Sequence, residues 1–234
     1  MSSGGNSTSG RVAAAIVNHG TPDLTRMAVW SLRGHYPDLP ITVVESGSAD
    51  DSAERLRALA DEVRPFTLVE CAHNVHHGPG LDLAIRAMDA EWALVFDSDC
   101  ILYRPGLLEA MLALPAAPGA YMIGDVVTID AMGYRPDGGA QETWAYVHPR
   151  CALVRRATYE RLPPFEKHGV PCLANEKAAA AQGHPLVHFP VDAYVYHFGR
   201  GTAARHGYRL GWKGRLWELR HRLRRLGRAV AGRR

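Results

Sequence analysis

Short apolar runs alternate with segments of helical character through the first half of the chain, and this alternation restricts the fold more than any other feature. The apolar runs predict strands at residues 12–17, 41–44, 66–69 and 92–96. The intervening segments predict helices at about 22–33, 48–62 and 81–89. Thr21 and Pro22 mark the first helix start, as N-cap residue and first helical residue. Strands and helices in this order form right-handed βαβ units, so we predict an α/β fold around a mostly parallel sheet.

The second half departs from this regular alternation. It predicts helices at 105–114 and 176–182 and strands at 121–129, 152–155 and 187–197, with a Gly- and Pro-rich loop near 134–139. The sequence has no internal repeat and no linker before residue 200. We therefore expect one domain at 11–202, after a disordered Ser/Gly-rich tail at 1–10 that lacks the apolar core of a signal peptide, and before an arm at 203–234.

Two aspartates directly follow the fourth predicted strand. Asp97 and Asp99 flank Ser98, immediately after the apolar run at 92–96. Such a run predicts a buried strand of a parallel sheet, and ligands of open α/β sheets bind beyond the carboxyl ends of the strands. Two carboxylates at that edge can hold Mg²⁺ or Mn²⁺ together with phosphate oxygens of a substrate. The alternative is a turn whose acids only cap the next helix, and the neighbouring motifs favour the cation site.

The net charge of +3 conceals two regions of opposite sign. From Arg205 onward eleven Lys and Arg face one acid, Glu218, so the arm carries +10 and the rest of the chain −7. Apolar residues of the arm recur on one helical face, which predicts a basic amphipathic helix. Such a helix suits an anionic membrane surface, or packing on the domain or on a second copy of the chain in a homodimer. Nucleic acid is the least favoured partner, because no nucleic-acid-reading module accompanies the charge.

Cysteine usage and hydropathy indicate the cellular compartment in which the protein is expected. Four widely spaced cysteines, with no Cys-x-x-Cys pair, are typical of reduced thiols rather than of a disulfide framework. No apolar stretch approaches the ~20 residues that a membrane-spanning helix needs. We expect a cytoplasmic protein, which the arm would allow to associate with the cytoplasmic face of a membrane.

Four patches and a later histidine, in this order, resemble family 2 glycosyltransferases of the GT-A fold. The patches are Asn18-His19-Gly20, the turn at 43–48, the segment 74–83 and Asp97-Ser98-Asp99; the histidine is His197. The resemblance covers about residues 11–202. It implies a GT-A-like, Rossmann-like domain that moves a sugar, with inversion, from a nucleotide-diphosphate donor to an acceptor hydroxyl.

The resemblance also implies a donor site. Glu45 takes the first acidic place of the family's turn after the second strand, and Ser46 replaces the second acid. A carboxylate can accept the imide N–H of uracil, so a UDP-sugar is favoured, although the substitution leaves the base open. Glycines at 78 and 80 permit close approach to the nucleotide, and the helix start offers N–H groups to an anion. The residues expected to contact the donor are Asn18, His19, Glu45, His77, Gly78, Asp97, Ser98 and Arg200.

The metal ligands implied by the resemblance are Asp97, Asp99 and His197. Asp99 would bind the cation directly, with Asp97 beside it near the ribose. His197 as third ligand would favour Mn²⁺ over Mg²⁺, because imidazole suits Mn²⁺ better. The alternative for His197 is a purely structural role.

Inverting transfer requires a carboxylate that takes the proton of the acceptor hydroxyl. Glu176, at a predicted helix start, best matches the family's position for this base. Its alternative role is a favourable interaction with the helix dipole. The rival bases are Asp125, Glu142 and Glu166.

The acceptor itself, whether a glycan, a lipid-linked or a small molecule, is left open. The region 132–149 is expected to bind it through Trp144, Tyr146 and His148, unless these residues pack in the core. A pyrophosphorylase is disfavoured, because the segment after the first strand lacks a Gly-rich loop with Arg or Lys. The alternatives from other classes are a non-catalytic nucleotide-sugar-binding protein and a nucleic-acid-binding protein that uses the arm.

Overall fold

The computed structural model describes residues 8–130, 133, 136, 142–166 and 169–199. The chain divides into two compact units, Met1–His197 and Phe198–Arg234. Most of the loop predicted near 134–139, the arm at 203–234 and Arg200 lie outside the described residues. Residues 8–10, expected in a disordered tail, belong to the short helix α1 (Thr8–Arg11).

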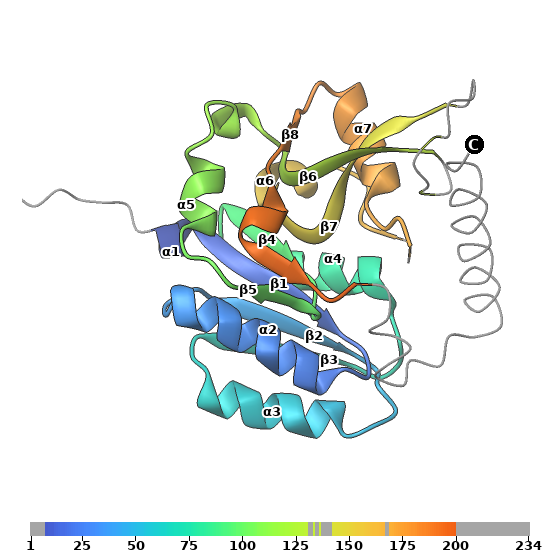
Figure 1. Cartoon of the computed structure of the whole chain (residues 1–234). Coiled ribbons are helices and arrows are strands. Elements are labelled where there is room, and N and C mark those ends of the chain that lie inside the picture. Colours follow the sequence, from blue (N-terminus) through green and yellow to red (C-terminus); the bar gives the residue numbers. More distant parts are fainter. Residues whose placement is uncertain (1–7, 131–132, 134–135, 137–141, 167–168, 200–234) are drawn as a thin grey trace, which may run out of the picture. The chain divides into compact units, whose positions relative to one another are not determined.

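A seven-stranded sheet forms the centre of the first unit, in the order β3-β2-β1-β4-β7-β6-β8 (Figure 1). Its strands are β1 (Val12–Asn18), β2 (Ile41–Ser46), β3 (Phe66–Cys71), β4 (Trp92–Phe96), β6 (Met122–Ile129), β7 (Trp144–Arg155) and β8 (Leu186–His188). The first four run parallel, whereas β7 is antiparallel to both β4 and β6. A separate antiparallel pair joins β5 (Cys100–Leu102) to β9 (Val195–His197).

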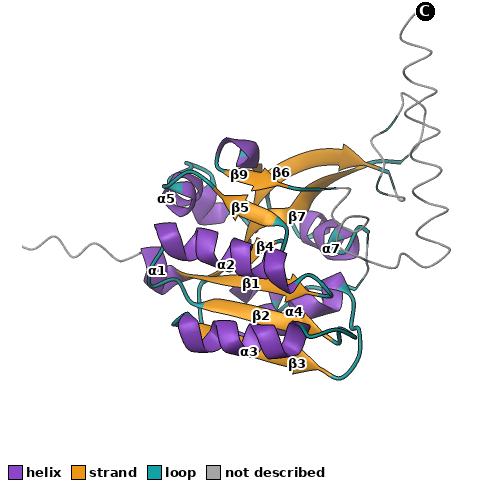
Figure 2. Ribbon diagram, turned by 60° about the horizontal axis from the view of Figure 1, so that its bottom comes forward, coloured by secondary structure: helices purple, strands orange, loops and turns teal. Residues whose placement is uncertain are grey.

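Helices cover both faces of the sheet, because alternate residues of its buried strands point to opposite sides. Ala14 and Ile16 of β1 face the core that α2 (Pro22–His35), α3 (Ser52–Glu62) and α5 (Leu107–Leu112) cover. Ala13 and Ala15 face the core beneath α4 (His77–Ala87), α6 (Arg156–Tyr159) and α7 (Leu173–Ala181). Figure 2 shows α2 and α3 in front of the strands and α4 behind them.

The predicted α/β fold is confirmed, with differences in the second half. The strand predicted at 152–155 is the end of the twelve-residue β7, which begins at Trp144. The strand predicted at 187–197 is two strands, β8 and β9, in different sheets, separated by a 3₁₀ turn at Val191–Ala193. These differences arise because the pairing partner of a strand is distant in sequence, and local patterns do not report it.

Candidate functional site

The carboxyl ends of β1 and β2 meet at one edge of the sheet, where Asn18 is in register with Glu45. Both side chains are buried. Asn18 Nδ2 donates to Glu45 Oε2, and the Ser48 N–H donates to Glu45 Oε1 at 2.6 Å. Thr25 Oγ1 donates to Asn18 Oδ1 at 2.7 Å, which fixes the amide. Glu45 therefore already holds the end of β1 through one oxygen and the turn after β2 through the other, and its contact with a donor base stays a prediction.

A second network joins the first three sequence patches. His19 Nδ1 lies 2.9 Å from the Ser46 carbonyl and must donate to it, so Nε2 can accept from Asn74 Nδ2 at 3.1 Å. Ser46 Oγ donates to Asn74 Oδ1 at 3.1 Å. Gly47 has φ +57°, and a Cβ there would meet the His73 carbonyl carbon at 2.2 Å. Only glycine thus allows the two turns to pack this closely.

The third patch turns into α4 directly beside the acidic motif. Gly80 packs α4 onto β1, since a Cβ at this position would lie 2.9 Å from both methyl groups of Val17. His77, the first residue of α4, places Nε2 3.0 Å from Asp97 Oδ1. The predicted donor contact His77 is therefore a neighbour of Asp97. Gly78, in the same helical turn, is buried.

Asp97 and Asp99 lie in the turn between β4 and β5, together with Ser98. Strand β9 brings His197 to them from about a hundred residues away in sequence: its Nε2 lies 3.2 Å from Asp99 Oδ1 and 4.0 Å from Asp97 Oδ2. The three predicted metal residues therefore lie together in the structure.

The electrostatics of this centre follow from burial and opposite charge. Burial alone would raise the pKa of Asp97, but the neighbouring histidines, chiefly His77, together outweigh it, so the pKa lies below its ordinary value. Burial alone would lower the pKa of His77 and of His197, and the aspartates outweigh it in both cases. His148 lies on β7 with its ring 6.4 Å from that of His197. Its pKa is lowered because the groups packed around the ring exclude water from it, although the residue keeps an exposed surface. The aspartates of this centre therefore lie among the imidazole rings of His77, His148 and His197.

The donor atoms present fit a divalent cation. Asp97 Oδ1 is buried and has no hydrogen-bond donor of good geometry among the described residues, although His77 is near it. A carboxylate oxygen of Asp99, a ring nitrogen of His197 and Cys100 Sγ all lie within 4.8 Å of one another. Cys100 is not among the ligands expected from the sequence, because only the pairing of β5 with β9 places it opposite His197.

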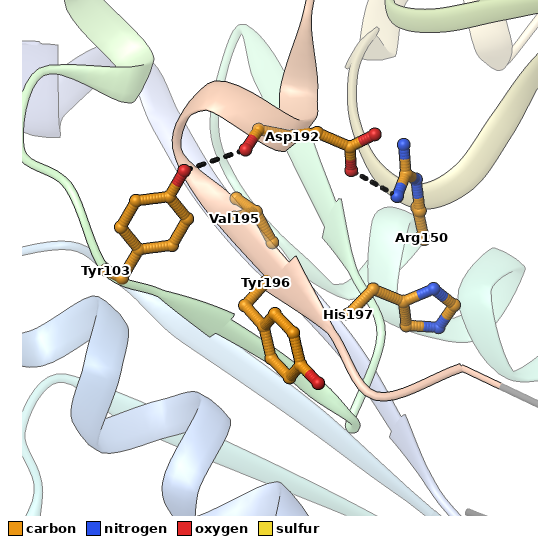
Figure 3. A pocket seen from close by; sticks show the side chains of 6 residues that line it. All are labelled: Tyr103, Arg150, Asp192, Val195, Tyr196 and His197. Atoms are coloured by element: carbon orange, nitrogen blue, oxygen red, sulfur yellow. Dashed lines mark hydrogen bonds and ion pairs between the residues drawn. The ribbon is translucent and has the colours of Figure 1, made fainter. Parts of the chain in front are cut away.

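Arg150 of β7 is ion-paired both with Asp125 of β6 and with Asp192 in the 3₁₀ turn before β9. Its Nη2 lies 2.8 Å from Asp125 Oδ2 and its Nη1 2.6 Å from Asp192 Oδ1. Arg150 and Asp192 border a hollow of about 540 Å³, shown in Figure 3, that His197 also lines. The remaining lining residues are Tyr103, Val195 and Tyr196. Asp125, a rival for the base, is therefore ion-paired beside the centre.

Glu176 is in a different environment. The side chain is 1% exposed, and Oε2 accepts the Val147 N–H at 3.0 Å. Oε1 is buried with no hydrogen-bond partner in the described part of the chain. Burial raises the pKa of this carboxyl well above its ordinary value, and the Val147 N–H only partly offsets that effect. The rivals Glu142 and Glu166 are both exposed.

The three aromatic residues expected to meet the acceptor differ in exposure, although the rings of Tyr146 and His148 lie 6.4 Å apart. Tyr146 is buried in the core, which is the alternative role stated above for these aromatic residues. Trp144 stacks beneath Lys177, whose Nζ lies 3.7 Å from the ring centroid. His148 is exposed and near the acidic centre.

Solved structures with the same fold are glycosyltransferases. The mannosyltransferase PcManGT from Pyrobaculum calidifontis, in complex with GDP-Man and Mn²⁺, is 20% identical with a TM-score of 0.59, over 77% of this chain and 55% of that one. TarS 1–349 from S. aureus, with UDP-GlcNAc, is 16% identical with a TM-score of 0.59, over 81% and 59%. The glucosyl-3-phosphoglycerate synthase from Mycobacterium tuberculosis, with phosphoglyceric acid, is 16% identical with a TM-score of 0.56, over 81% and 72%.

These likenesses define the class as a GT-A α/β domain, and the chain spans little more than half the length of the first two proteins. The model of glycosyl transferase family 2 matches residues 14–174, more than half of the chain, so the protein belongs to that family. No curated protein matches the chain.

Proposed function

We propose that this protein is a metal-dependent, inverting glycosyltransferase that uses a nucleotide-diphosphate sugar, with a UDP-sugar favoured. The observation that carries the proposal is the cluster of Asp97, Asp99 and His197 at the carboxyl edge of the sheet of a family 2 chain. A divalent cation, Mn²⁺ rather than Mg²⁺ because of the imidazole, would supply Lewis-acid stabilisation of the departing diphosphate. PcManGT, with GDP-Man and Mn²⁺ bound, supports this choice of cation.

The chain's own residues would prepare that chemistry. Asp99 and His197 would hold the cation, and His77 would keep Asp97 ionised and oriented beside it. The α4 N-terminus, which His77 begins beside Asp97, would direct backbone N–H groups at the diphosphate. Asn18, His19 and Glu45 would form the wall for the nucleoside, in a network already fixed by hydrogen bonds. Ser98 and Gly78 would border the donor, and Arg200 lies outside the described residues.

Glu176 is our proposal for the catalytic base. Its raised pKa makes the carboxylate a stronger proton acceptor, and Oε1 has no competing donor among the described residues. The assignment requires the acceptor hydroxyl to reach a side chain that is 1% exposed. Asp125 is the alternative base, because it is ion-paired with Arg150, which lines the same hollow as His197.

A non-catalytic nucleotide-sugar-binding protein is the second candidate function. The burial of Glu176 favours it, because a base that no acceptor reaches cannot take a proton. Product analysis discriminates the two: a transferase forms a glycoside of inverted configuration from the donor, whereas a binding protein returns the donor unchanged.

The acceptor and the location of the protein complete the proposal. An acceptor hydroxyl of a glycan, a lipid-linked sugar or a small molecule would enter near His148. The arm at 203–234 would bind an anionic membrane surface on the cytoplasmic side, or a second copy of the chain. Among the described residues, no helix is both long and apolar enough to cross a membrane.

A screen of nucleotide sugars by thermal unfolding, with Mn²⁺ and with EDTA, tests the proposal. A ligand that binds only the native state raises apparent stability by mass action, by about 2.7 kcal/mol at a hundredfold excess over Kd. We expect one class of nucleotide sugar to stabilise the protein in Mn²⁺ and far less in EDTA. Stabilisation by none, in either buffer, would reject the proposed donor site.

A further inference from the structure

A cysteine thiol lies in the acidic centre, and none of the steps proposed above uses it. Cys100 is fully buried, and it follows Asp99 directly. In the β5–β9 pair Cys100 is directly opposite His197. Side chains of directly opposite residues in an antiparallel pair lie on the same face of the sheet. The thiol and the imidazole are therefore neighbours by the geometry of the strands, not by a chance side-chain rotamer.

The three donor atoms are close enough to share one ion. A carboxylate oxygen of Asp99, the Cys100 Sγ and a ring nitrogen of His197 lie within 4.8 Å of one another, and the oxygen–nitrogen distance is 3.2 Å. Bonds of about 2.0–2.3 Å to Zn²⁺ place tetrahedral donors roughly 3.3–3.8 Å apart. The oxygen–nitrogen distance is already close to that spacing, so binding requires the Cys100 Sγ to move towards the other two atoms.

The chemistry of this set differs from that of a purely oxygen- and nitrogen-based site. Thiolate sulfur selects soft or borderline cations such as Zn²⁺ and Cd²⁺, whereas Mn²⁺ and Mg²⁺ prefer oxygen. Three protein ligands with a fourth position open to water is also the usual arrangement of non-structural zinc sites.

We propose that Asp99, Cys100 and His197 form a site for a thiophilic divalent cation such as Zn²⁺, which displaces the Mn²⁺ that the transfer reaction uses. Only the competition with Mn²⁺ rests on the proposed function; the ligand set rests on the geometry of the centre. On binding, the Cys100 Sγ–H bond breaks, its proton passes to solvent and a sulfur–metal bond forms. The hydrogen bond from that thiol to the Arg150 carbonyl, at 3.4 Å, is lost in the same step.

Binding of Mn²⁺ and binding of a thiophilic cation should differ in their dependence on the nucleotide sugar. Mn²⁺ at this centre would have few protein ligands and would complete its coordination with diphosphate oxygens, so its binding should depend on the nucleotide sugar. A thiophilic cation has three protein ligands of its own and should bind the protein without any nucleotide.

Cobalt spectroscopy on the full-length protein tests the ligand set, because a thiolate bound to Co²⁺ adds a charge-transfer band in the near ultraviolet. We expect the band when Co²⁺ is added to the wild type without nucleotide, and its loss in both Cys100→Ser and Cys100→Ala. Cys151→Ser is the matched control, since Cys151 is an equally buried thiol on the adjacent β7. It should keep the band. Circular dichroism confirms that each variant is folded.

The absence of a band in the wild type, or its persistence in folded Cys100→Ser and Cys100→Ala, would overturn the proposal. The competition is measured as the Zn²⁺ concentration that reverses Mn²⁺-dependent stabilisation by the nucleotide sugar, which we expect to rise at least about tenfold in Cys100→Ser. A Co²⁺ band without any nucleotide-sugar binding would reject the proposed function and leave this site standing. Nucleotide-sugar binding without a band would do the reverse.

Discussion

Replacement of Glu176 by glutamine changes the pH dependence of stability in a direction that the structure fixes. Burial raises the pKa of Glu176 above its value in the unfolded chain, so the folded state keeps a proton that the unfolded state loses. The stability of the wild type is therefore greatest below the unfolded pKa and falls as pH rises from there through the folded pKa. While one proton separates the two states, the free energy of unfolding falls by about 1.4 kcal/mol per pH unit.

Glutamine has nearly the same shape, can accept the Val147 N–H and does not ionise. Glu176→Gln should therefore remove this contribution and be more stable than the wild type at pH 8. Urea unfolding of both proteins from pH 4 to pH 8 measures the difference. Glu142→Gln is the control, because the exposed Glu142 side chain has no comparable burial. Parallel stability profiles for wild type and Glu176→Gln would refute the reasoning. The same variant tests the base: turnover should fall by orders of magnitude with donor affinity near that of the wild type.

Three further predictions concern packing, the metal and the arm. In a urea titration, Gly80→Ala should lower the free energy of unfolding by about 1–3 kcal/mol, because the new Cβ would lie 2.9 Å from the Val17 methyl groups. Gly34→Ala in α2 is the control: the new Cβ has open space around it, so this variant should be neutral or stabilising. His197→Gln should weaken Mn²⁺ binding by about 10-fold or more in a calorimetric titration with nucleotide sugar present, and unchanged affinity would remove this residue from the ligand set. Truncation after Thr202 should abolish co-sedimentation with anionic vesicles at low salt; equal pelleting of both forms would reject the membrane role of the arm.

The succession of strands and helices along the first half of the chain and the position of the acidic motif could be predicted from the sequence, because both depend on local patterns. The apolar run before Asp97 is a buried strand, and the ends of β1, β2 and β4 lie at one edge because parallel strands share a direction. The predicted proximity of His197 to Asp99 is also observed, although that prediction came from the resemblance and not from the local pattern.

What the local pattern does not contain is long-range pairing. The bridge from Asp125 through Arg150 to Asp192 links three strands or turns that are far apart in sequence, and nothing in their neighbours indicates it. The approach of Cys100 to His197 depends on the register of two three-residue strands, which are too short to show a hydrophobic period. The burial of Glu176 depends on the N-terminal half of β7, whose strand character the sequence did not reveal.

Isothermal titration of the matching nucleotide sugar into wild type and Asp99→Asn, each with Mn²⁺ and with EDTA, tests the central claim most directly. Asparagine keeps the size of the side chain and removes the charge that would hold the cation. The wild type should bind the donor at least about tenfold more tightly with Mn²⁺ than with EDTA, because the cation links Asp99 to the diphosphate. Asp99→Asn should bind weakly and equally in both buffers. Equal affinities in all four titrations, or a full Mn²⁺ effect in Asp99→Asn, would contradict a metal-dependent donor site at this centre.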